Sequence, residues 1–72
     1  MKASLLVSVI IPTFNRSEKV VRAVKSVLNQ SYVNLECIVI DDSSTDDTVD
    51  QLYAVKATDH RLIIIVHDNN QH

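Results

Sequence analysis

Short, nearly continuous apolar runs alternate along this chain with longer segments in which apolar residues recur at helical spacing. Three runs rich in valine, isoleucine and leucine occupy residues 7–11, 35–40 and 61–66. Uninterrupted runs of this kind are typical of parallel strands that are covered on both faces. Two amphipathic segments, residues 17–29 and about 45–57, separate the runs. The pattern predicts an α/β chain with the order strand, helix, strand, helix, strand and short connections, which suits a three-stranded parallel sheet.

The first amphipathic segment carries its apolar residues on one side and its polar residues on the other. Asn15 and Glu18 stand three residues apart at its start, as in a capping box, so we expect Asn15 to cap this helix. Ser44 or Thr45 is the candidate N-cap of the second helix. The residues expected to face the sheet are Val20, Val21, Val24, Val27 and Leu28 in the first helix, and Val49, Leu52, Tyr53 and Lys56 in the second.

The turns must form without glycine, because the chain contains none. Sharp turns between strands and helices often need the positive φ that glycine adopts freely. We expect Ser43, Asn15 and Asn34 to take these positions. Pro12 lacks a backbone N–H, so strand pairing is expected to stop there.

Composition limits the chain to one small domain. It has 72 residues, of which 46% are hydrophobic, and a formal net charge of −2. That charge gives no electrostatic reason to expect nucleic acid or an anionic membrane as a partner. The single cysteine, Cys37, lies within an apolar run and is expected to be a small buried side chain. The apolar residues near the N-terminus are too few to span a bilayer, which takes roughly 20 residues.

Candidate chemistry is concentrated where the second apolar run ends. Two adjacent carboxylates, Asp41 and Asp42, are followed by hydroxyl residues and the start of the second helix. In an open parallel sheet this carboxyl edge is where ligands bind. Carboxylates are costly to desolvate without a partner, so one interpretation of this pair is a ligand-binding site. The other reading is that both acids are solvated and favour the start of the next helix.

Three blocks of this sequence resemble the start of family 2 glycosyltransferases. They are VSVIIPTFNR at residues 7–16, VLNQS at residues 27–31 and ECIVIDDSSTD at residues 36–46, in the family's order and spacing. Members of that family have the GT-A fold and use nucleotide-diphospho-sugars. The resemblance covers essentially the whole chain. It implies that residues 1–72 are the N-terminal, Rossmann-like nucleotide-recognition part of a longer GT-A domain.

The resemblance also implies a nucleotide pocket made by Pro12, Thr13, Phe14 and Asp42. The Asp42 carboxylate can accept a hydrogen bond from the imide N–H of uracil, which favours a UDP-sugar, and Phe14 offers an apolar face to the base or ribose. Two alternatives stay open: Phe14 as a hydrophobic staple on the first helix, and Asp42 as a solvated cap. Asp41 is expected to fix the turn through backbone N–H groups.

The resemblance places the remaining chemistry of the family outside this chain. The Asp-x-Asp motif that holds a divalent ion, Mn²⁺ or Mg²⁺, lies on a later strand, as do the acceptor site and the catalytic base. We therefore expect no catalytic or metal-binding residue here, no bound cofactor and no turnover by this chain alone. The whole enzyme is expected in the cytoplasm, at the inner membrane face. Ser43 stands where the family usually has glycine.

Three other kinds of site fit these residues less well. Adjacent residues at a strand end point to opposite sides, which argues against a shared ion at Asp41 and Asp42. The polar C-terminal segment, with His67, Asp68 and His72, offers three zinc ligands but reads as an exposed tail. A receiver-like module would need a phospho-accepting acid at the end of the third strand, for which Asp68 is poorly placed.

Two surfaces suggest partners of a different kind. Lys19, Arg22 and Lys25 form a basic strip on the first helix, which is most simply a solvated face and could otherwise meet an anionic partner. The sheet is expected to have open edges, which favour pairing with another copy. The alternative function is therefore a non-catalytic interaction or assembly module, and self-association is expected in either case.

Overall fold

The computed structural model describes residues 5–67 and contains one parallel sheet with two helices. Strand β2 lies in the middle, with β1 and β3 on either side of it. The predicted β-α-β-α-β order and the parallel sheet are therefore confirmed. In chain order the elements are β1 (Val7–Thr13), α1 (Ser17–Leu28), β2 (Leu35–Asp42), α2 (Thr48–Lys56) and β3 (Leu62–His67).

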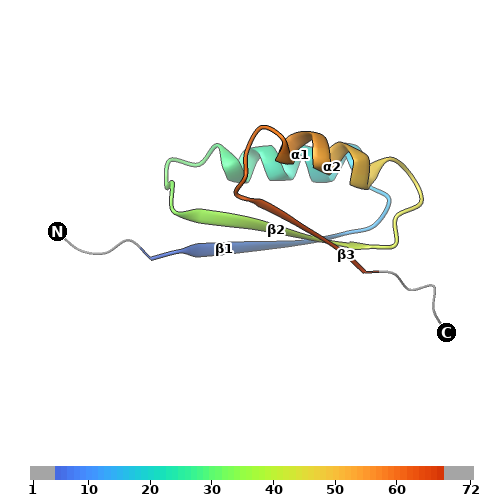
Figure 1. The fold of residues 1–72 in the computed structure, drawn as a ribbon, viewed down its shortest axis with the longest axis horizontal. Helices are drawn as coiled ribbons and strands as arrows, with labels where there is room; N and C mark the ends of the chain where they lie inside the picture. The colour runs from blue at the N-terminus through green and yellow to red at the C-terminus, as the bar shows by residue number, and fades with distance from the viewer. Residues whose placement is uncertain (1–4, 68–72) are drawn as a thin grey trace.

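Both helices lie on the same face of the sheet (Figure 1). The order of the strands across the sheet is also their order along the chain, so the chain steps in one direction at each crossover. Crossovers of one hand that step in one direction place their helices on one face. This arrangement brings the three strand ends, and the connections that leave them, to a single edge.

The hydrophobic core lies between the helices and this covered face. Val24, Cys37, Val39, Leu52 and Leu62 are fully buried there. Cys37 is a free thiol whose pKa is raised by burial, so it behaves as the small apolar side chain that the sequence predicts. The rest of the buried hydrophobic residues are Val20, Leu28, Leu35 and Val55.

The opposite face of the sheet has no helix over it in residues 5–67. Ile10, Ile63 and Ile65 on this side are 60%, 37% and 47% exposed. In the register Ile10 pairs with Ile38, which in turn pairs with Ile63. The expectation of strands covered on both faces therefore holds for one face only within the described chain.

Pro12 does not end β1, contrary to the prediction. The strand continues to Thr13, and Pro12 lies opposite Ile40 in the register. Among the described residues β1 is an edge strand. An edge strand tolerates proline where the missing N–H would face away from the neighbouring strand.

Both capping predictions are wrong. Helix α1 begins after Arg16 and has no side-chain cap, because Asn15 bonds to a different part of the chain. Helix α2 begins at Thr48, three residues beyond the later of the two predicted caps. There the Asp46 carboxylate accepts a hydrogen bond from the Thr48 N–H at 2.9 Å, and the bond from the Thr48 hydroxyl lowers the pKa of Asp46.

Helix α2 is also rotated relative to the predicted pattern. Leu52 is buried as expected, but Tyr53 is 51% exposed and Val55 takes the buried position instead. Lys56, which was expected on the same side, donates through Nζ to the Leu62 carbonyl at 2.7 Å. In α1 the predicted side is correct: Val20, Val24 and Leu28 are buried.

Candidate functional site

The carboxyl ends of the three strands meet at one edge of the sheet. Thr13 of β1 pairs with Asp41 of β2, and Asp42 pairs with His67 of β3. Phe14, the residue after Thr13, therefore leaves β1 next to the end of β2. The edge thus gathers the residues that the sequence singled out.

Asp41 is fully buried on the helix-covered side and is bonded within its own turn. Its Oδ2 accepts a hydrogen bond from the Ser44 N–H at 2.9 Å, and its Oδ1 accepts one from the Ser44 hydroxyl. The predicted role of Asp41, fixing the turn through a backbone N–H, is confirmed.

Asp42 points the other way. Its side chain is 55% exposed, and its Oδ1 lies 3.3 Å from Nδ1 of His67, whose side chain is 63% exposed. The two neighbouring carboxylates thus lie in different surroundings: Asp41 is buried and Asp42 is exposed to solvent. This confirms that adjacent residues at this strand end point to opposite sides.

The residues present do not fit a divalent cation. Asp41 and Asp42 diverge, and within residues 5–67 there is no group of three or more histidine, cysteine or acidic side chains that could hold a metal ion. The candidate zinc ligands Asp68 and His72 lie outside the described residues. No step is assigned to a metal at this edge.

Two non-glycine residues shape the turns with positive φ. Asn15 has φ 49° and Ser43 has φ 58°, so two of the three predicted substitutes for glycine are confirmed, and Asn34 is not among the positive-φ residues. Asparagine adopts this conformation readily, whereas serine adopts it at some cost. The Ser43 hydroxyl donates to the His67 carbonyl at 2.8 Å, which ties the turn after β2 to the end of β3.

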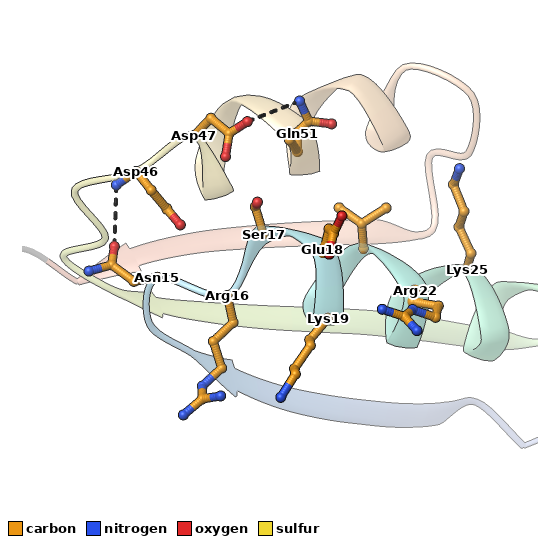
Figure 2. Close-up of a pocket in the computed structure, with 11 residues that line it drawn as sticks. Asn15, Arg16, Ser17, Glu18, Lys19, Arg22, Lys25, Asp46, Asp47 and Gln51 are labelled. Atoms are coloured by element: carbon orange, nitrogen blue, oxygen red, sulfur yellow. Dashed lines mark hydrogen bonds between the residues drawn. The ribbon is translucent and has the colours of Figure 1, made fainter.

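Asn15 connects the end of β1 to the loop after β2. Its side-chain oxygen accepts hydrogen bonds from the backbone N–H groups of Thr45 and Asp46 at 2.7 and 3.2 Å. Its Nδ2 donates to the Thr45 hydroxyl at 3.3 Å, and its own backbone N–H donates to the Ser44 hydroxyl at 2.8 Å. Figure 2 shows the bond to Asp46. The prediction that Asn15 caps α1 failed because its hydrogen-bond partners lie about 30 residues away along the chain.

The β1 residues of the predicted pocket differ in exposure. Pro12 is exposed, and Phe14 is 51% exposed, which leaves part of its ring open to a ligand. Thr13 is only 7% exposed, and its hydroxyl has no hydrogen-bond partner among residues 5–67.

A separate groove lies between α1 and the start of α2 (Figure 2). It has a volume of about 950 Å³ and is lined by both cationic and acidic side chains, among them Arg22, Lys25 and Asp47. None of the four predicted pocket residues lines it. The groove adjoins the strand-end site through Asn15 and Asp46, and its mixed charge does not single out a ligand class.

The family model described as glycosyl transferase family 2 matches residues 8–72. The chain belongs to this family. It is 47% identical over 60 residues to UDP-Glc:alpha-D-GlcNAc-diphosphoundecaprenol beta-1,3-glucosyltransferase WfaP of Escherichia coli, a match that covers 83% of this chain and 23% of that protein. It is 42% identical over 62 residues to GalNAc(5)-diNAcBac-PP-undecaprenol beta-1,3-glucosyltransferase of Campylobacter jejuni, covering 86% of this chain and 20% of that one.

A solved glycosyltransferase structure has a similar fold over most of this chain. Mannosyltransferase PcManGT from Pyrobaculum calidifontis, in complex with GDP-Man and Mn²⁺, matches 92% of this chain with a TM-score of 0.73 and 26% identity. The resemblance to family 2 glycosyltransferases and the Rossmann-like GT-A portion are thus confirmed. The chain spans about a fifth to a quarter of the proteins it matches.

The chain therefore shares the sequence pattern of this family over residues 8–72 and the fold of a solved structure that contains GDP-Man. None of the helices in residues 5–67 is long and apolar enough to cross a membrane.

Proposed function

We propose that this chain is the nucleotide-recognition part of a glycosyltransferase that moves a sugar from a UDP-sugar to an acceptor hydroxyl. One observation carries the proposal. At the carboxyl end of the central strand Asp42 is exposed, and Phe14, one residue beyond the Thr13–Asp41 pair, is half-exposed, while Asp41 is buried and bonded within its own turn.

In this proposal Asp42 accepts a hydrogen bond from the imide N–H of uracil, and Phe14 packs against the base or the ribose. Pro12 and Thr13 complete the pocket. The contribution of Thr13 comes from its backbone, because its side chain is only 7% exposed. A hydrogen bond to an ionised acceptor is stronger than a neutral one, so Asp42 supplies most of the base recognition.

The matched proteins support a nucleotide-sugar donor, and their names differ in the base. The Escherichia coli relative is named for UDP-Glc, and the Pyrobaculum structure contains GDP-Man with Mn²⁺. We propose uracil for this chain from the single exposed carboxylate at the strand end. In the whole protein a divalent ion would neutralise the leaving diphosphate. Since the described residues do not fit such an ion, we propose that this chain binds nucleotide without metal and without turnover.

Titration calorimetry tests this. The 72-residue chain is titrated with UDP, with and without Mn²⁺, alongside Asp42→Ala. We expect weak binding that does not depend on Mn²⁺ and is lost in Asp42→Ala. Asp50→Ala, an exposed acid in the first turn of α2, is the matched control and retains binding.

Three results would contradict the proposal in different ways. Equal binding of GDP and UDP would reject uracil recognition. Unchanged binding in Asp42→Ala would reject the role of that carboxylate. No binding by the unaltered chain would reject a working nucleotide pocket in it.

We also propose that the whole protein works in the cytoplasm, at the inner face of a membrane. The support is that the acceptors in the names of both relatives are linked to undecaprenol through a diphosphate. Cell fractionation checks this: the protein is expected with the membrane fraction and to be released by salt, and recovery outside the cytoplasmic compartment would contradict it.

We propose further that copies of this chain self-associate, as an assembly module would. Within the described residues β1 and β3 have no strand on their outer sides, and isoleucines are exposed on the helix-free face. Open edges and apolar faces favour pairing with another copy. Analytical ultracentrifugation at tens of micromolar should give a dimer or larger species, and a monomer would contradict the proposal.

A further inference from the structure

We infer that Asn15 is a positioning residue for the nucleotide, because it holds the β1 and β2 halves of the pocket in one arrangement. The inference rests on the proposed function. Asn15 directly follows Phe14, and its side chain bonds to the loop that begins after Asp42. It is thus the residue through which the two proposed contacts are linked.

The link is made of several bonds that restrain both sides. One side-chain oxygen accepts from two consecutive peptide N–H groups, those of Thr45 and Asp46, at 2.7 and 3.2 Å. The backbone N–H of Asn15 donates to the Ser44 hydroxyl at 2.8 Å, and that same hydroxyl bonds to the buried Asp41. Movement of the end of β1 therefore disturbs the turn that orients the Asp42 side chain.

Asn15 is well suited to this role by conformation and position. Its φ of 49° lies in the left-handed region, which asparagine tolerates better than most residues. It is exposed and is not part of the hydrophobic core. Loss of its side chain therefore leaves the packing between helices and sheet intact and acts on the geometry of the pocket. A loosened pocket must be ordered when the nucleotide binds, which lowers affinity.

Two substitutions separate the side chain from the backbone. Asn15→Gly keeps access to positive φ and removes every side-chain bond, whereas Asn15→Asp keeps an acceptor for the same two N–H groups. Asn29→Gly, at the other end of α1, is the matched control, because no side-chain hydrogen bond of Asn29 links two segments of the described chain. Ser44→Ala removes the acceptor of the Asn15 N–H together with one hydrogen bond to Asp41, and it perturbs the same link from the β2 side if Asn15→Gly does not fold.

The measurement is calorimetric affinity for UDP, at a temperature where circular dichroism gives the same folded signal for each variant. We expect Asn15→Gly to bind about tenfold more weakly, which corresponds to the net contribution of about one of its hydrogen bonds, and Ser44→Ala to be weakened as well. Asn15→Asp should stay within about threefold of the unaltered chain, since its carboxylate replaces the lost acceptor. Asn29→Gly should bind normally. Because circular dichroism gives the same folded signal for each variant, a loss of affinity in Asn15→Gly is not a loss of folded protein.

The outcomes distinguish this inference from the proposal beneath it. If the unaltered chain binds UDP and Asn15→Gly binds equally well, the positioning role is overturned and the nucleotide pocket stands. Equal weakening of Asn15→Asp and Asn15→Gly also overturns it, because the acceptor would then not matter. If the unaltered chain does not bind UDP, the proposed function fails, and this inference fails with it.

Discussion

Each end of the sheet has a polar side chain that reaches across to a second connection, and these two side chains differ in charge. At the carboxyl end the neutral amide of Asn15 bridges the β1–α1 connection and the β2–α2 connection. At the amino end Arg61, just before β3, bridges to the end of α1 and to the connection that leads into β2.

The Arg61 guanidinium donates hydrogen bonds to two carbonyls and to one carboxylate. Its Nη2 donates to the Leu28 carbonyl at 2.8 Å and its Nη1 donates to the Val33 carbonyl at 3.3 Å. Its Nη2 and Nε also meet the Asp59 carboxylate at 2.8 and 3.0 Å. The Arg61 guanidinium, through its hydrogen bonds, lowers the pKa of Asp59 to about 2.

The two ends of the sheet differ in how their charged groups are paired. At the amino end the charged groups satisfy one another and the nearby carbonyls. At the carboxyl end the neutral side chain of Asn15 links the two connections, and the carboxylate of Asp42 is 55% exposed. The exposed charged groups therefore differ between the two ends of the sheet.

Asp41→Ala should have the largest effect on stability. It leaves the Ser44 N–H and hydroxyl without their acceptor in a partly buried turn, so we expect the free energy of unfolding to fall by about 2–4 kcal/mol. Urea unfolding followed by circular dichroism measures this. Asp42→Ala is the control and should change the value by less than about 0.5 kcal/mol, because that side chain is largely exposed. Similar losses in both variants would erase the distinction between the two acids.

Ser43→Val tests the turn at the carboxyl end. A β-branched residue at φ 58° is strained by about 1–3 kcal/mol and also loses the bond to the His67 carbonyl. Ser43→Gly relieves the strain while losing the same bond, so its free energy of unfolding should stay close to that of the unaltered chain. Thermal melts of the two variants decide the matter, and a Val variant as stable as the Gly variant would contradict the strain.

Arg61→Ala should lower the stability by less than Asp41→Ala. The bond to the Val33 carbonyl is exposed and the bond to the Leu28 carbonyl is only partly buried, so water can replace part of what Arg61 donates. Arg61→Lys is the matched variant: it keeps the charge without the fork of donors and should recover only part of the loss in urea unfolding. Full recovery by lysine would mean that charge alone holds the amino end.

Acid should affect the amino end before it affects the Asn15 link. Because the folded-state pKa of Asp59 is below its unfolded value of about 3.9, the stability it contributes is present above that value and is lost as the pH falls toward about 2. We expect Asp59→Asn to be less stable than the unaltered chain at pH 5 and equally stable near pH 2. Urea midpoints measured across this interval check the sign, and a constant difference would contradict it.

The fold was predictable because its signals are local. Periodic apolar residues mark α1 within one residue of its observed end, and Val20, Val24 and Leu28 are buried as the spacing requires. The pattern in α2 was weaker, so Tyr53 was placed on the buried side that Val55 occupies. The edge position of β1, which accommodates Pro12, depends on the order of the strands and has no local signal.

The site was predictable only in part, for the same physical reason. Asp41 bonds to a residue three positions away, and the sequence identified its role. The partners of Asn15 are about 30 positions away, and a local capping pattern gave a plausible but wrong alternative. Arg61 bonds to carbonyls 28 and 33 positions away, and backbone carbonyls leave no trace in a sequence.

The order of the strands has a consequence for how the polypeptide assembles during synthesis. Since β1, β2 and β3 lie side by side in the order in which they are translated, each new strand can be added to the open edge of the one before it. No strand has to be inserted between two others, and each pairing spans only one intervening helix. The nascent chain can therefore build this sheet progressively as it leaves the ribosome.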